Sequence, residues 1–157
     1  FIKSMQVTLV ILKPSALQRG ILGEVISRFE KKGLQIVGVK MLNLTDNELE
    51  IHYSHLVDKP YYSRIKDSMQ ASPVIVMALK GVDVVNVVRK VTGVTNGREA
   101  DPGTIRGDFS VSVQENIVHA SDSAETAEIE LKRFFNTDEI FNYPQLTIRS
   151  VYAGDEY

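Results

Sequence analysis

Near its start the chain reads VTLVIL from Val7 to Leu12, and Lys13-Pro14 follows directly. A run of β-branched and apolar residues without polar alternation is typical of a strand that is covered on both faces. Proline cannot continue a hydrogen-bond ladder, so Pro14 marks the end of this strand. The sequence therefore predicts a buried central strand, and with it a sheet that carries the core of the fold.

The apolar spacing then alternates between helical and strand-like patterns along the chain. A helical face begins at Ile21 and ends before Gly33, a residue type suited to terminating a helix. Thr45 and Asp83 are residue types that cap helices, and each precedes a further helical pattern. We predict strands over residues 7–12, 34–44, 73–79 and 117–120, helices over 21–32, 47–56, after 60, 84–92 and 124–135, and a long loop over 94–109.

This order of elements predicts an α/β sandwich with its helices on one face of the sheet. It is compatible with a ferredoxin-like βαββαβ core to which extra helices and a long loop are added. For a chain of 157 residues we expect a single domain, over residues 5–157. We expect residues 1–4 to be an added remnant, with Met5 as the native start.

The composition excludes several classes of protein. The chain is 43% hydrophobic and 24% charged, and its net charge of -2 provides no basic field for nucleic acid or an anionic membrane. It contains no cysteine, which excludes disulfides and thiolate metal sites and suits a reducing compartment. The longest apolar runs are far shorter than the ~20 residues that span a bilayer, and we see no signal peptide ahead of Met5. We therefore expect a cytoplasmic protein.

The segment from Asn116 to Ser123, NIVHASDS, holds the clearest chemical signal. It places His119 in a short strand-like run that opens into a Ser/Asp cluster at the start of a helix. Helix N-termini favour anions, and a histidine with a pKa of about 6.5 is largely neutral at neutral pH, so it can attack phosphorus directly. The arrangement suits a phosphohistidine intermediate, and a core histidine with satisfied nitrogens is the open alternative.

Three separated motifs resemble those of nucleoside diphosphate kinases, in the order that the family has them. They are Asn116-x-x-His119-x-Ser121-Asp122, Lys13-Pro14 with Gln18-Arg19-Gly20, and the run Pro102–Phe109. The resemblance extends from about Met5 to the C-terminal end without a large insertion. It implies an antiparallel four-stranded ferredoxin-like sheet and ping-pong transfer of the γ-phosphoryl group from a nucleoside triphosphate to a nucleoside diphosphate. It also implies a homo-oligomer, for which the C-terminal length favours a hexamer. The phosphate chemistry in turn implies Mg²⁺ that arrives with the nucleotide, and stacking on an aromatic ring implies broad base tolerance.

The resemblance also implies roles for individual residues. His119 is the expected phosphoryl carrier, Glu130 is expected to orient it, and Lys13 and Tyr53 complete the catalytic set. The residues expected to bind the nucleotide are Lys13, Tyr61, Ile65, Arg89, Thr95, Arg106, Val113 and Asn116. Those expected to support the histidine from behind are Ser121 and Asp122. Within this set, the Tyr61 ring is expected to stack on the base, and no protein ligand to a metal is expected.

A phosphate site in this chain must gather its ligands from scattered positions. The nearest P-loop match, over residues 33–38, lies in a strand pattern and is followed by Val39-Lys40, so we reject it. Guanidinium groups suit bidentate phosphate contacts, and lysine acts as a point charge. Taken singly, Arg89 is more readily a solvated charge on a helix, because exposed arginine is the common case. Glu130 alone is at least equally a surface glutamate, and Tyr61 alone is equally a partly buried aromatic residue.

Two further patterns carry weaker signals. His52 and His55 are three residues apart on a predicted helix, within reach of a shared metal, but two ligands without nearby carboxylates make a weak site. Ser123 or Asp122 is expected to cap the helix that follows the histidine segment.

Three positions depart from the family pattern. Ser15 stands where most members carry aspartate, and Tyr61 stands where phenylalanine is common. Gly97 stands where many members carry proline, in a loop that contributes to subunit contacts in the family. Because proline holds φ at about −65°, Gly97→Pro should raise thermal stability if the loop backbone accepts that angle.

A non-catalytic ferredoxin-like module that binds nucleotides or nucleic acid is the alternative function. It lacks support, because the net charge is negative and the chain has no Lys/Arg-rich run and no aromatic pair of the RNA-binding type. The intact set of expected catalytic residues argues against an inactive scaffold. We therefore expect nucleoside tri- and diphosphates as partners, and neither a membrane nor an obligate nucleic acid.

Overall fold

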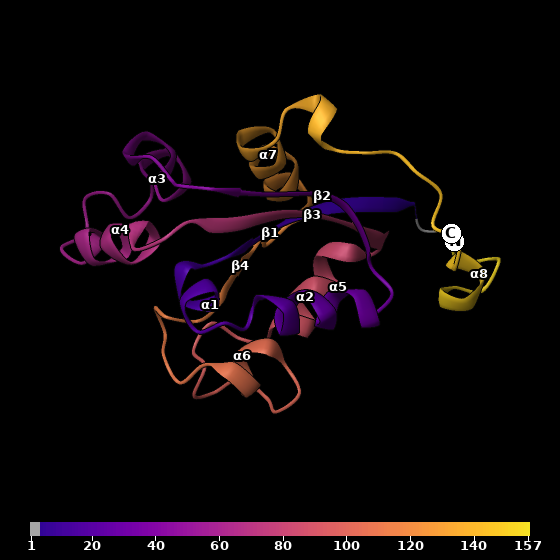
Figure 1. The fold of residues 1–157 in the computed structure, drawn as a ribbon, viewed down its shortest axis with the longest axis horizontal. Helices are drawn as coiled ribbons and strands as arrows, with labels where there is room; N and C mark the ends of the chain where they lie inside the picture. Colours follow the sequence, from indigo (N-terminus) through magenta and orange to yellow (C-terminus); the bar gives the residue numbers. More distant parts are fainter. Residues whose placement is uncertain (1–3) are drawn as a thin grey trace.

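The computed structural model of the chain describes residues 4–157, and its centre is a four-stranded sheet. The strands are β1 (Met5–Leu12), β2 (Gln35–Leu42), β3 (Val74–Val82) and β4 (Val118–Ala120), in the spatial order β2-β3-β1-β4. Every pair of neighbouring strands is antiparallel. This is the predicted ferredoxin-like arrangement, and Figure 1 shows helices above and below the sheet.

The strand β1 lies in the interior of the sheet, as predicted. It pairs with β3 along its whole length and with β4 near its C-terminal end. Leu9 and Ile11 enter a hydrophobic cluster on one face of the sheet, while Val10 and Leu12 enter the cluster on the other, and all four are fully buried. Burial on both faces explains why this run shows no polar alternation.

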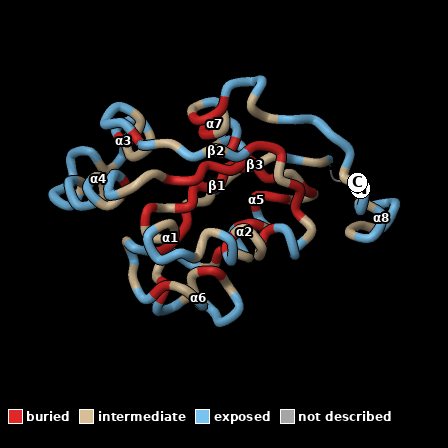
Figure 2. Tube along the Cα trace, viewed as in Figure 1, coloured by how far each residue is buried: buried red, intermediate tan, exposed pale blue. Residues whose placement is uncertain are grey.

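Helices cover both faces of the sheet. The crossover helices of the core, α2 (Leu22–Lys31) and α5 (Val84–Thr92), pack on one face. The cluster on the other face contains residues of α3 (Asp46–His52), α4 (Tyr62–Gln70) and α7 (Ala124–Phe134). Figures 1 and 2 show α7 on the opposite side of the sheet from α2 and α5, with buried residues in between. The prediction that the helices lie on one face of the sheet is therefore wrong. A strand that is apolar on both faces needs a covering layer on each side.

The helix starts follow from the residues that cap them. At α3 the Thr45 hydroxyl accepts from the Glu48 N–H, and the Glu48 carboxylate accepts from the Thr45 N–H, which forms a capping box. At α7 the Ser123 Oγ accepts from the Thr126 N–H at 3.0 Å. Both caps are as predicted. At α5 the cap expected of Asp83 is replaced by a hydrogen bond from the side chain of Asn86 to the Asp83 carboxylate.

The following short elements were not predicted, because they are too short to show a periodic pattern. The helix α1 (Pro14–Gln18) starts at the proline that ends β1, because proline is favoured in a first helical turn. The helix α6 (Ile105–Phe109) lies inside the loop predicted over residues 94–109. A 3₁₀ turn, η1 (Thr137–Glu139), and α8 (Ile148–Val151) follow α7. The expected remnant at residues 1–4 falls mostly on residues 1–3, which lie outside the described part of the chain.

The C-terminal segment runs along the β2 side of the sheet. The Phe141 N–H donates to the Val37 carbonyl at 2.8 Å, and the Gln35 side chain donates to the Tyr143 carbonyl at 2.9 Å. Figure 1 shows this segment ending in α8, far from α3 and α4. Within residues 4–157 no helix combines the length and hydrophobicity needed to cross a membrane.

The loop before α6 leaves no room for a side chain at Gly97. Its N–H donates to the Ser112 carbonyl at 3.0 Å, and a Cβ atom at this position would lie 2.4 Å from the Ser110 carbonyl oxygen. Proline would remove the N–H and add ring atoms against that backbone. The condition for stabilisation by proline is therefore not met, and the expectation from the sequence reverses.

We expect Gly97→Pro to lower the melting temperature, because the hydrogen bond to the Ser112 carbonyl is lost at a cost of about 0.5–1.5 kcal/mol and the overlap with Ser110 adds to it. Thermal unfolding followed by circular dichroism measures the effect. Gly23→Ala is the control, since no atom lies within 4 Å of a Cβ there and alanine is expected to add about 0.5–1 kcal/mol to the stability of α2. A Gly97→Pro protein as stable as the parent would contradict this loop geometry.

Candidate active site

Two adjacent strands bring the predicted lysine and histidine to the same end of the sheet. In the pairing of β1 with β4, His119 lies opposite Ile11. The Lys13 N–H donates to the Ile117 carbonyl at 2.9 Å, which extends the contact beyond the last residue of β1. Because Pro14 then turns the chain into α1, the Lys13 side chain is fixed at the point where the strand ends.

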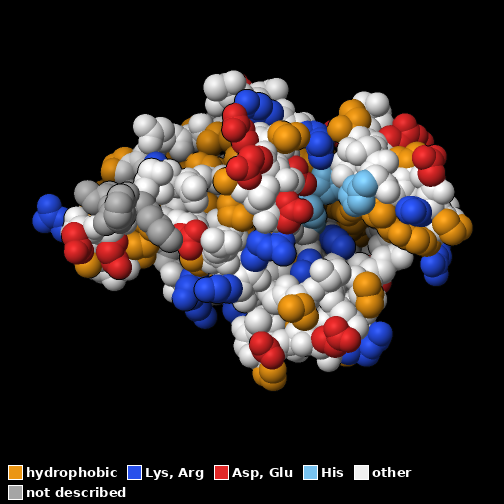
Figure 3. Space-filling model, turned by 180° about the vertical axis from the view of Figure 1, so that it is seen from behind, with side chains coloured by type: hydrophobic (Ala, Val, Ile, Leu, Met, Phe, Trp, Pro, Cys, Tyr) orange, Lys and Arg blue, Asp and Glu red, His pale blue; other side chains and the backbone are white. Residues whose placement is uncertain are grey.

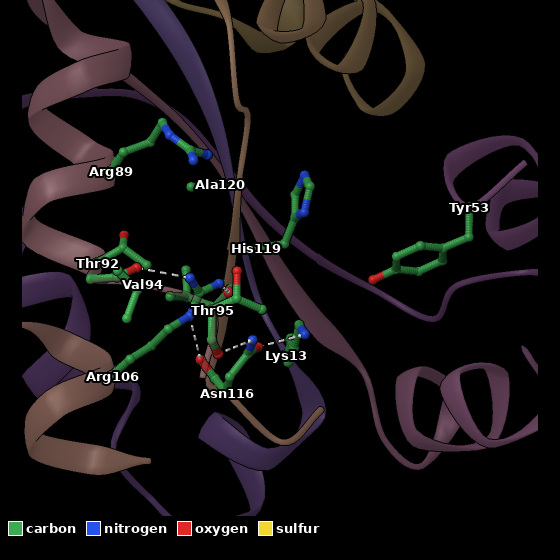
Figure 4. Close-up of a pocket in the computed structure, with 12 residues that line it drawn as sticks. Lys13, Tyr53, Arg89, Thr92, Val94, Thr95, Arg106, Asn116, His119 and Ala120 are labelled. Atoms are coloured by element: carbon green, nitrogen blue, oxygen red, sulfur yellow. Dashed lines mark hydrogen bonds between the residues drawn. The ribbon is translucent and has the colours of Figure 1, made fainter. Parts of the chain in front are cut away.

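The predicted phosphate-binding residues line a cavity of about 350 Å³. Figure 4 shows the side chains that surround it, with the Tyr53 hydroxyl aimed toward the cavity from the side opposite α5. Figure 3 shows lysine and arginine side chains gathered beside the histidines in a hollow of the surface. The residues lining the cavity are Lys13, Tyr53, Arg89, Thr92, Gly93, Val94, Thr95, Arg106, Asn116, Val118, His119 and Ala120.

Backbone carbonyl groups hold the Arg106 guanidinium in place. Its Nε donates to the Asn116 carbonyl at 3.1 Å, its Nη1 to the Gly93 carbonyl at 3.0 Å and its Nη2 to the Val118 carbonyl at 2.6 Å. A guanidinium has five N–H donors, so two stay available for an anion. Burial, and next the charge of Arg89, lower the Arg106 pKa to about 10, which leaves the group charged at neutral pH. The site therefore contains a fixed cation before any ligand binds.

Asn116 joins three parts of the cavity wall. Its Oδ1 accepts from Lys13 Nζ at 2.7 Å, its Nδ2 donates to the Thr95 carbonyl at 3.0 Å, and its own carbonyl accepts from Arg106. Burial, followed by the charge of Arg106, lowers the Lys13 pKa to about 8, while Glu115 acts in the opposite direction. The amide therefore positions a lysine whose charge is made costly by burial.

The turn just before His119 is strained. Ile117 has a φ of 74°, which a β-branched residue rarely adopts, and the Val118 N–H donates to the Asn116 carbonyl at 2.8 Å across it. Such a backbone costs about 1–3 kcal/mol and persists only where its surroundings impose it. Here Ile117 is fully buried and Arg106 bonds the carbonyls on both sides of it. Nothing in the sequence signals this turn, because isoleucine is not a turn residue.

A buried carboxylate fixes the orientation of His119. His119 Nε2 lies 2.8 Å from Glu130 Oε2, and the Ser121 hydroxyl donates to Glu130 Oε1 at 2.6 Å. Burial alone would raise the Glu130 pKa, but the hydrogen bond and charge of His119 and the bond from Ser121 bring it below its ordinary value. The carboxylate is thus ionised at neutral pH, so Nε2 is the donor and Nδ1 keeps its lone pair. The histidine side chain is 23% exposed and can be reached from the cavity.

Sequence reasoning missed His52 as part of this site. It ends α3, its side chain is only 3% exposed, and its ring packs edge-on against His119 with centroids 4.5 Å apart. Its Nδ1 lies 3.3 Å from Glu130 Oε2. Burial, and next the field of His119, lower its pKa to about 3, so the ring is neutral at neutral pH. The available signal was its place directly before Tyr53, to which the resemblance gave a role.

The histidine pair considered as a metal site does not come together in the structure. His55 is exposed between α3 and α4, whereas His52, His119 and Glu130 bring ligand atoms within 4.8 Å of one another. Arg133 Nη1 lies 2.9 Å from His52 Nδ1, the nitrogen nearest the carboxylate. Because a guanidinium at that position opposes a divalent cation, we interpret this cluster as a hydrogen-bond network.

A second cavity, of about 310 Å³, adjoins the first. Lys13, Tyr53, Thr95 and Asn116 line both. The second is mostly apolar, and the residues found only there are Leu56, Tyr61, Arg64, Ile65, Ser68, Met69, Val113 and Gln114. The structure thus brings together the aromatic and aliphatic residues predicted to hold a base, next to the cationic cavity.

Two of the remaining sequence candidates lie apart from these cavities. Asp122 is exposed in the turn before α7 and lines neither cavity, unlike its predicted companion Ser121, which bonds Glu130. Ser15, the departure after Lys13-Pro14, has a buried hydroxyl without a hydrogen-bond partner among the described residues. We find no contact of Ser15 that explains its presence there.

Known sequences that are similar to this chain point to one family. A model of the family described as nucleoside diphosphate kinase matches residues 6–140. A nucleoside diphosphate kinase of Parabacteroides distasonis is 62% identical over 153 residues, which cover 98% of this chain and all of the relative. One of Pyrococcus abyssi is 49% identical over 141 residues, which cover 88% of this chain and 89% of the relative.

Solved structures agree with this result. The structure of a halophilic nucleoside diphosphate kinase from Halobacterium salinarum in complex with CDP superposes with a TM-score of 0.91 at 33% identity, over 95% of this chain and 99% of that one. A nucleoside diphosphate kinase family protein from Babesia bovis superposes with a TM-score of 0.89 at 35% identity, over 94% and 99% of the two chains.

The burial of Lys13 sets a pH limit on anion binding. Its pKa of about 8 means that the ammonium loses its proton as pH rises through that value, so the cavity then loses one positive charge. We expect the affinity for ADP, measured by calorimetry, to be highest below this pH and to fall by about tenfold or more above it. Lys13→Met should bind more weakly and lose the step, while Lys31→Met, at the exposed end of α2, should keep the parent curve. An affinity that does not change with pH in the parent would refute the assignment.

Proposed function

The chain belongs to the nucleoside diphosphate kinase family and transfers phosphoryl groups between nucleotides, and from this premise we propose that His119 carries the phosphoryl group between the two substrates. The observation that carries the proposal is the 2.8 Å contact between His119 Nε2 and Glu130 Oε2. Since Nε2 holds the proton, Nδ1 is the nucleophilic nitrogen, and the histidine lines the cavity that contains the cations.

The reaction proceeds in two half-reactions at one site. In the first, the Nδ1 lone pair attacks the γ-phosphorus of a nucleoside triphosphate, and the N–P bond forms as the bond to the β–γ bridging oxygen breaks. The nucleoside diphosphate leaves with that electron pair. In the second, a terminal oxygen of an acceptor diphosphate attacks the phosphorus, and the N–P electrons return to the histidine. The two nucleotides occupy the site in turn, so the kinetics are ping-pong.

Glu130 stabilises the ring while it is phosphorylated. Attack by Nδ1 makes the imidazole positively charged, with the proton still on Nε2. The buried carboxylate next to that proton offsets the charge as it develops, and its second oxygen stays bonded to Ser121. Glu130 and Ser121 therefore act on the histidine and not on the nucleotide.

The cations and Tyr53 hold the transferred phosphoryl group. Arg106 and Lys13 are positioned by the protein before binding, and Arg89 faces the same cavity from α5. Their charges compensate the oxygens of the phosphoryl group as it moves between oxygen and nitrogen. Burial raises the pKa of Tyr53 to about 12, so its hydroxyl stays protonated and can donate to a phosphate oxygen. Asn116 and Lys13 also bind the ribose, and Thr95 binds a phosphate.

We propose Mg²⁺ as the divalent ion of this family's chemistry. No Asp or Glu is among the described residues that line the phosphate cavity, so the oxygen ligands that Mg²⁺ prefers must come from the nucleotide and water. The cavity fits an ion that arrives with the phosphates. When bound, the ion offsets part of the phosphate charge.

The base site is proposed to accept different bases. The Tyr61 ring would stack on the base, with Ile65 and Val113 completing an apolar slot. Stacking discriminates poorly among bases because every base has a π-face. The nucleoside is therefore held by shape and the phosphates by charge.

We also propose that the single-domain chain, residues 5–157, forms a homo-oligomer, specifically a hexamer, in the cytoplasm. Val39 and Met41 on the edge strand β2 are more than half exposed, and Leu146 in the C-terminal segment is 91% exposed. Contact between copies of the chain would remove this apolar surface from water, which supports association. The long C-terminal segment suits the hexameric branch of the family, and a chain without cysteine suits a reducing compartment.

The non-catalytic binding module is not favoured. Such a protein would not need a histidine whose tautomer is set by a buried carboxylate inside a cationic cavity. The curated relatives that cover the whole chain are kinases by name.

We expect His119→Ala to reduce phosphoryl transfer by at least about a thousandfold while nucleotide binding is kept, because the nucleophile is lost and the cations stay. Incubation with γ-labelled ATP and Mg²⁺ without acceptor should label His119 in the parent, and GDP should remove the label as GTP. His55→Ala is the matched control, since His55 is exposed outside the cavities and its loss should leave the rate unchanged. Label on another residue, or transfer by His119→Ala near the parent rate, would refute the mechanism.

We expect Tyr61→Ala to weaken binding of ADP, GDP and CDP to a similar extent, by about 1–3 kcal/mol each, because a stacking surface is lost for every base. Tyr61→Phe should bind like the parent, since the ring is retained. Calorimetric titration of the three diphosphates measures both variants. A loss confined to one base would show that Tyr61 reads base identity.

A further inference from the structure

We propose that Arg133 is a positioning residue which, through His52, reserves the Glu130 carboxylate for His119. The inference rests on the proposed role of His119 as phosphoryl carrier. It assigns a function to two side chains that do not touch the nucleotide. Both lie behind the histidine, on α7 and at the end of α3.

The four side chains form a continuous row of contacts. Arg133 Nη1 lies 2.9 Å from His52 Nδ1, this nitrogen lies 3.3 Å from Glu130 Oε2, and the same oxygen lies 2.8 Å from His119 Nε2. Arg133 and Glu130 are three residues apart on α7, so they share one face of the helix. The row is well enclosed, with the His52 and Glu130 side chains 3% and 5% exposed.

The chemistry of the guanidinium decides the tautomer of His52. A guanidinium donates and cannot accept, so the His52 Nδ1 that faces it must present a lone pair. The ring proton is then on Nε2, and Nδ1 has no proton to give to Glu130. His119 is left as the only histidine that donates to Glu130 Oε2 among these contacts, while Oε1 is occupied by Ser121.

Without Arg133, the other tautomer of His52 becomes available. A proton on Nδ1 at 3.3 Å from Glu130 Oε2 would donate to the carboxylate and offset part of its negative charge, so the same oxygen would hold the His119 proton less strongly. His119 would then populate the tautomer with the proton on Nδ1, which cannot attack phosphorus. The expected loss is in the rate of phosphorylation and not in nucleotide binding, since neither residue lines the phosphate cavity.

The charges around His52 favour its neutral form. It faces His119 from β4, Glu130 and Arg133 from α7, Lys13 from the end of β1 and the neighbouring Tyr53 ring. Burial, His119, Arg133 and Lys13 all lower the pKa of His52, and Glu130 opposes them. Removal of Arg133 raises the pKa of His52, so a protonated His52 that holds the carboxylate should become populated at a higher pH than in the parent.

The neighbouring Lys132 provides a matched control. It lies on the same helix with the same charge, but its side chain is 76% exposed and pairs with Glu128 at 2.9 Å. Lys132→Met removes one positive charge from α7 without touching the row of contacts. Arg133→Met removes the donor at similar side-chain length, Arg133→Leu does so with a second side chain, and Arg133→Lys keeps a donor.

The experiment has two readouts on the full-length protein. Nitrogen NMR of isotope-labelled histidines in the unphosphorylated protein reports the tautomers of His52 and His119. Single-turnover labelling with γ-labelled ATP reports the rate of phosphorylation.

For Arg133→Met and Arg133→Leu we expect the proton of His52 to shift to Nδ1, the Nε2-protonated fraction of His119 to fall, and phosphorylation to slow by about 10–100-fold with KM unchanged. On acidification, the phosphorylation rate of these variants should begin to fall at a higher pH than the rate of the parent.

Arg133→Lys should restore most of the rate, and Lys132→Met should match the parent in both readouts. Parent tautomers in Arg133→Met, or an equal loss in Lys132→Met, would overturn the proposal, because the effect would then be absent or a general charge effect. A parent protein that is not labelled on His119 at all would instead contradict the proposed function. The tautomer measurement does not depend on that outcome, and Arg133→Leu provides the test if Arg133→Met does not fold.

Discussion

The burial of β1 on both faces is the constraint on which the rest of the structure depends. Its apolar side chains enter two separate clusters, so helices must cover both sides of the sheet and the strand cannot shift its register. A strand fixed in this way delivers Lys13 to a defined point at its end and provides the edge on which the three residues of β4 pair. The geometry of the candidate site is therefore a consequence of core packing.

The site gathers positive charge that the fold must hold in place. Lys13, Arg89 and Arg106 face one cavity, and burial makes the charge of Lys13 and Arg106 less favourable there. The backbone carbonyls around the strained turn at Ile117 offset the cost of burying Arg106, because they accept hydrogen bonds from its guanidinium. The Asn116 side chain likewise accepts a hydrogen bond from the Lys13 ammonium. Both the strain and the crowded cations cost stability, and an incoming phosphate relieves the second of these costs.

On the other side of His119 the site has the opposite character. A single buried carboxylate, Glu130, is approached by two histidines and one serine. A carboxylate in such a place is stabilised only as long as its hydrogen-bond partners are arranged in one way. In the proposed mechanism the cationic cavity binds the substrate, and the carboxylate on the other side of the histidine sets which nitrogen reacts. The two halves meet at one imidazole ring.

The sequence by itself determined the central strand, the main helices with their caps at Thr45 and Ser123, the ferredoxin-like order, and, through its resemblance to a known family, a set of the residues that line the two cavities. These follow from local signals, because periodicity and capping depend on near neighbours, and the motifs around Lys13 and His119 are contiguous. Only the tertiary structure decided the second helical layer, the positive φ of Ile117, the obstruction at Gly97, and the meeting of His52 with Glu130 and Arg133. These depend on atoms far apart in the chain, whose contacts arise only when the sheet and α7 pack together.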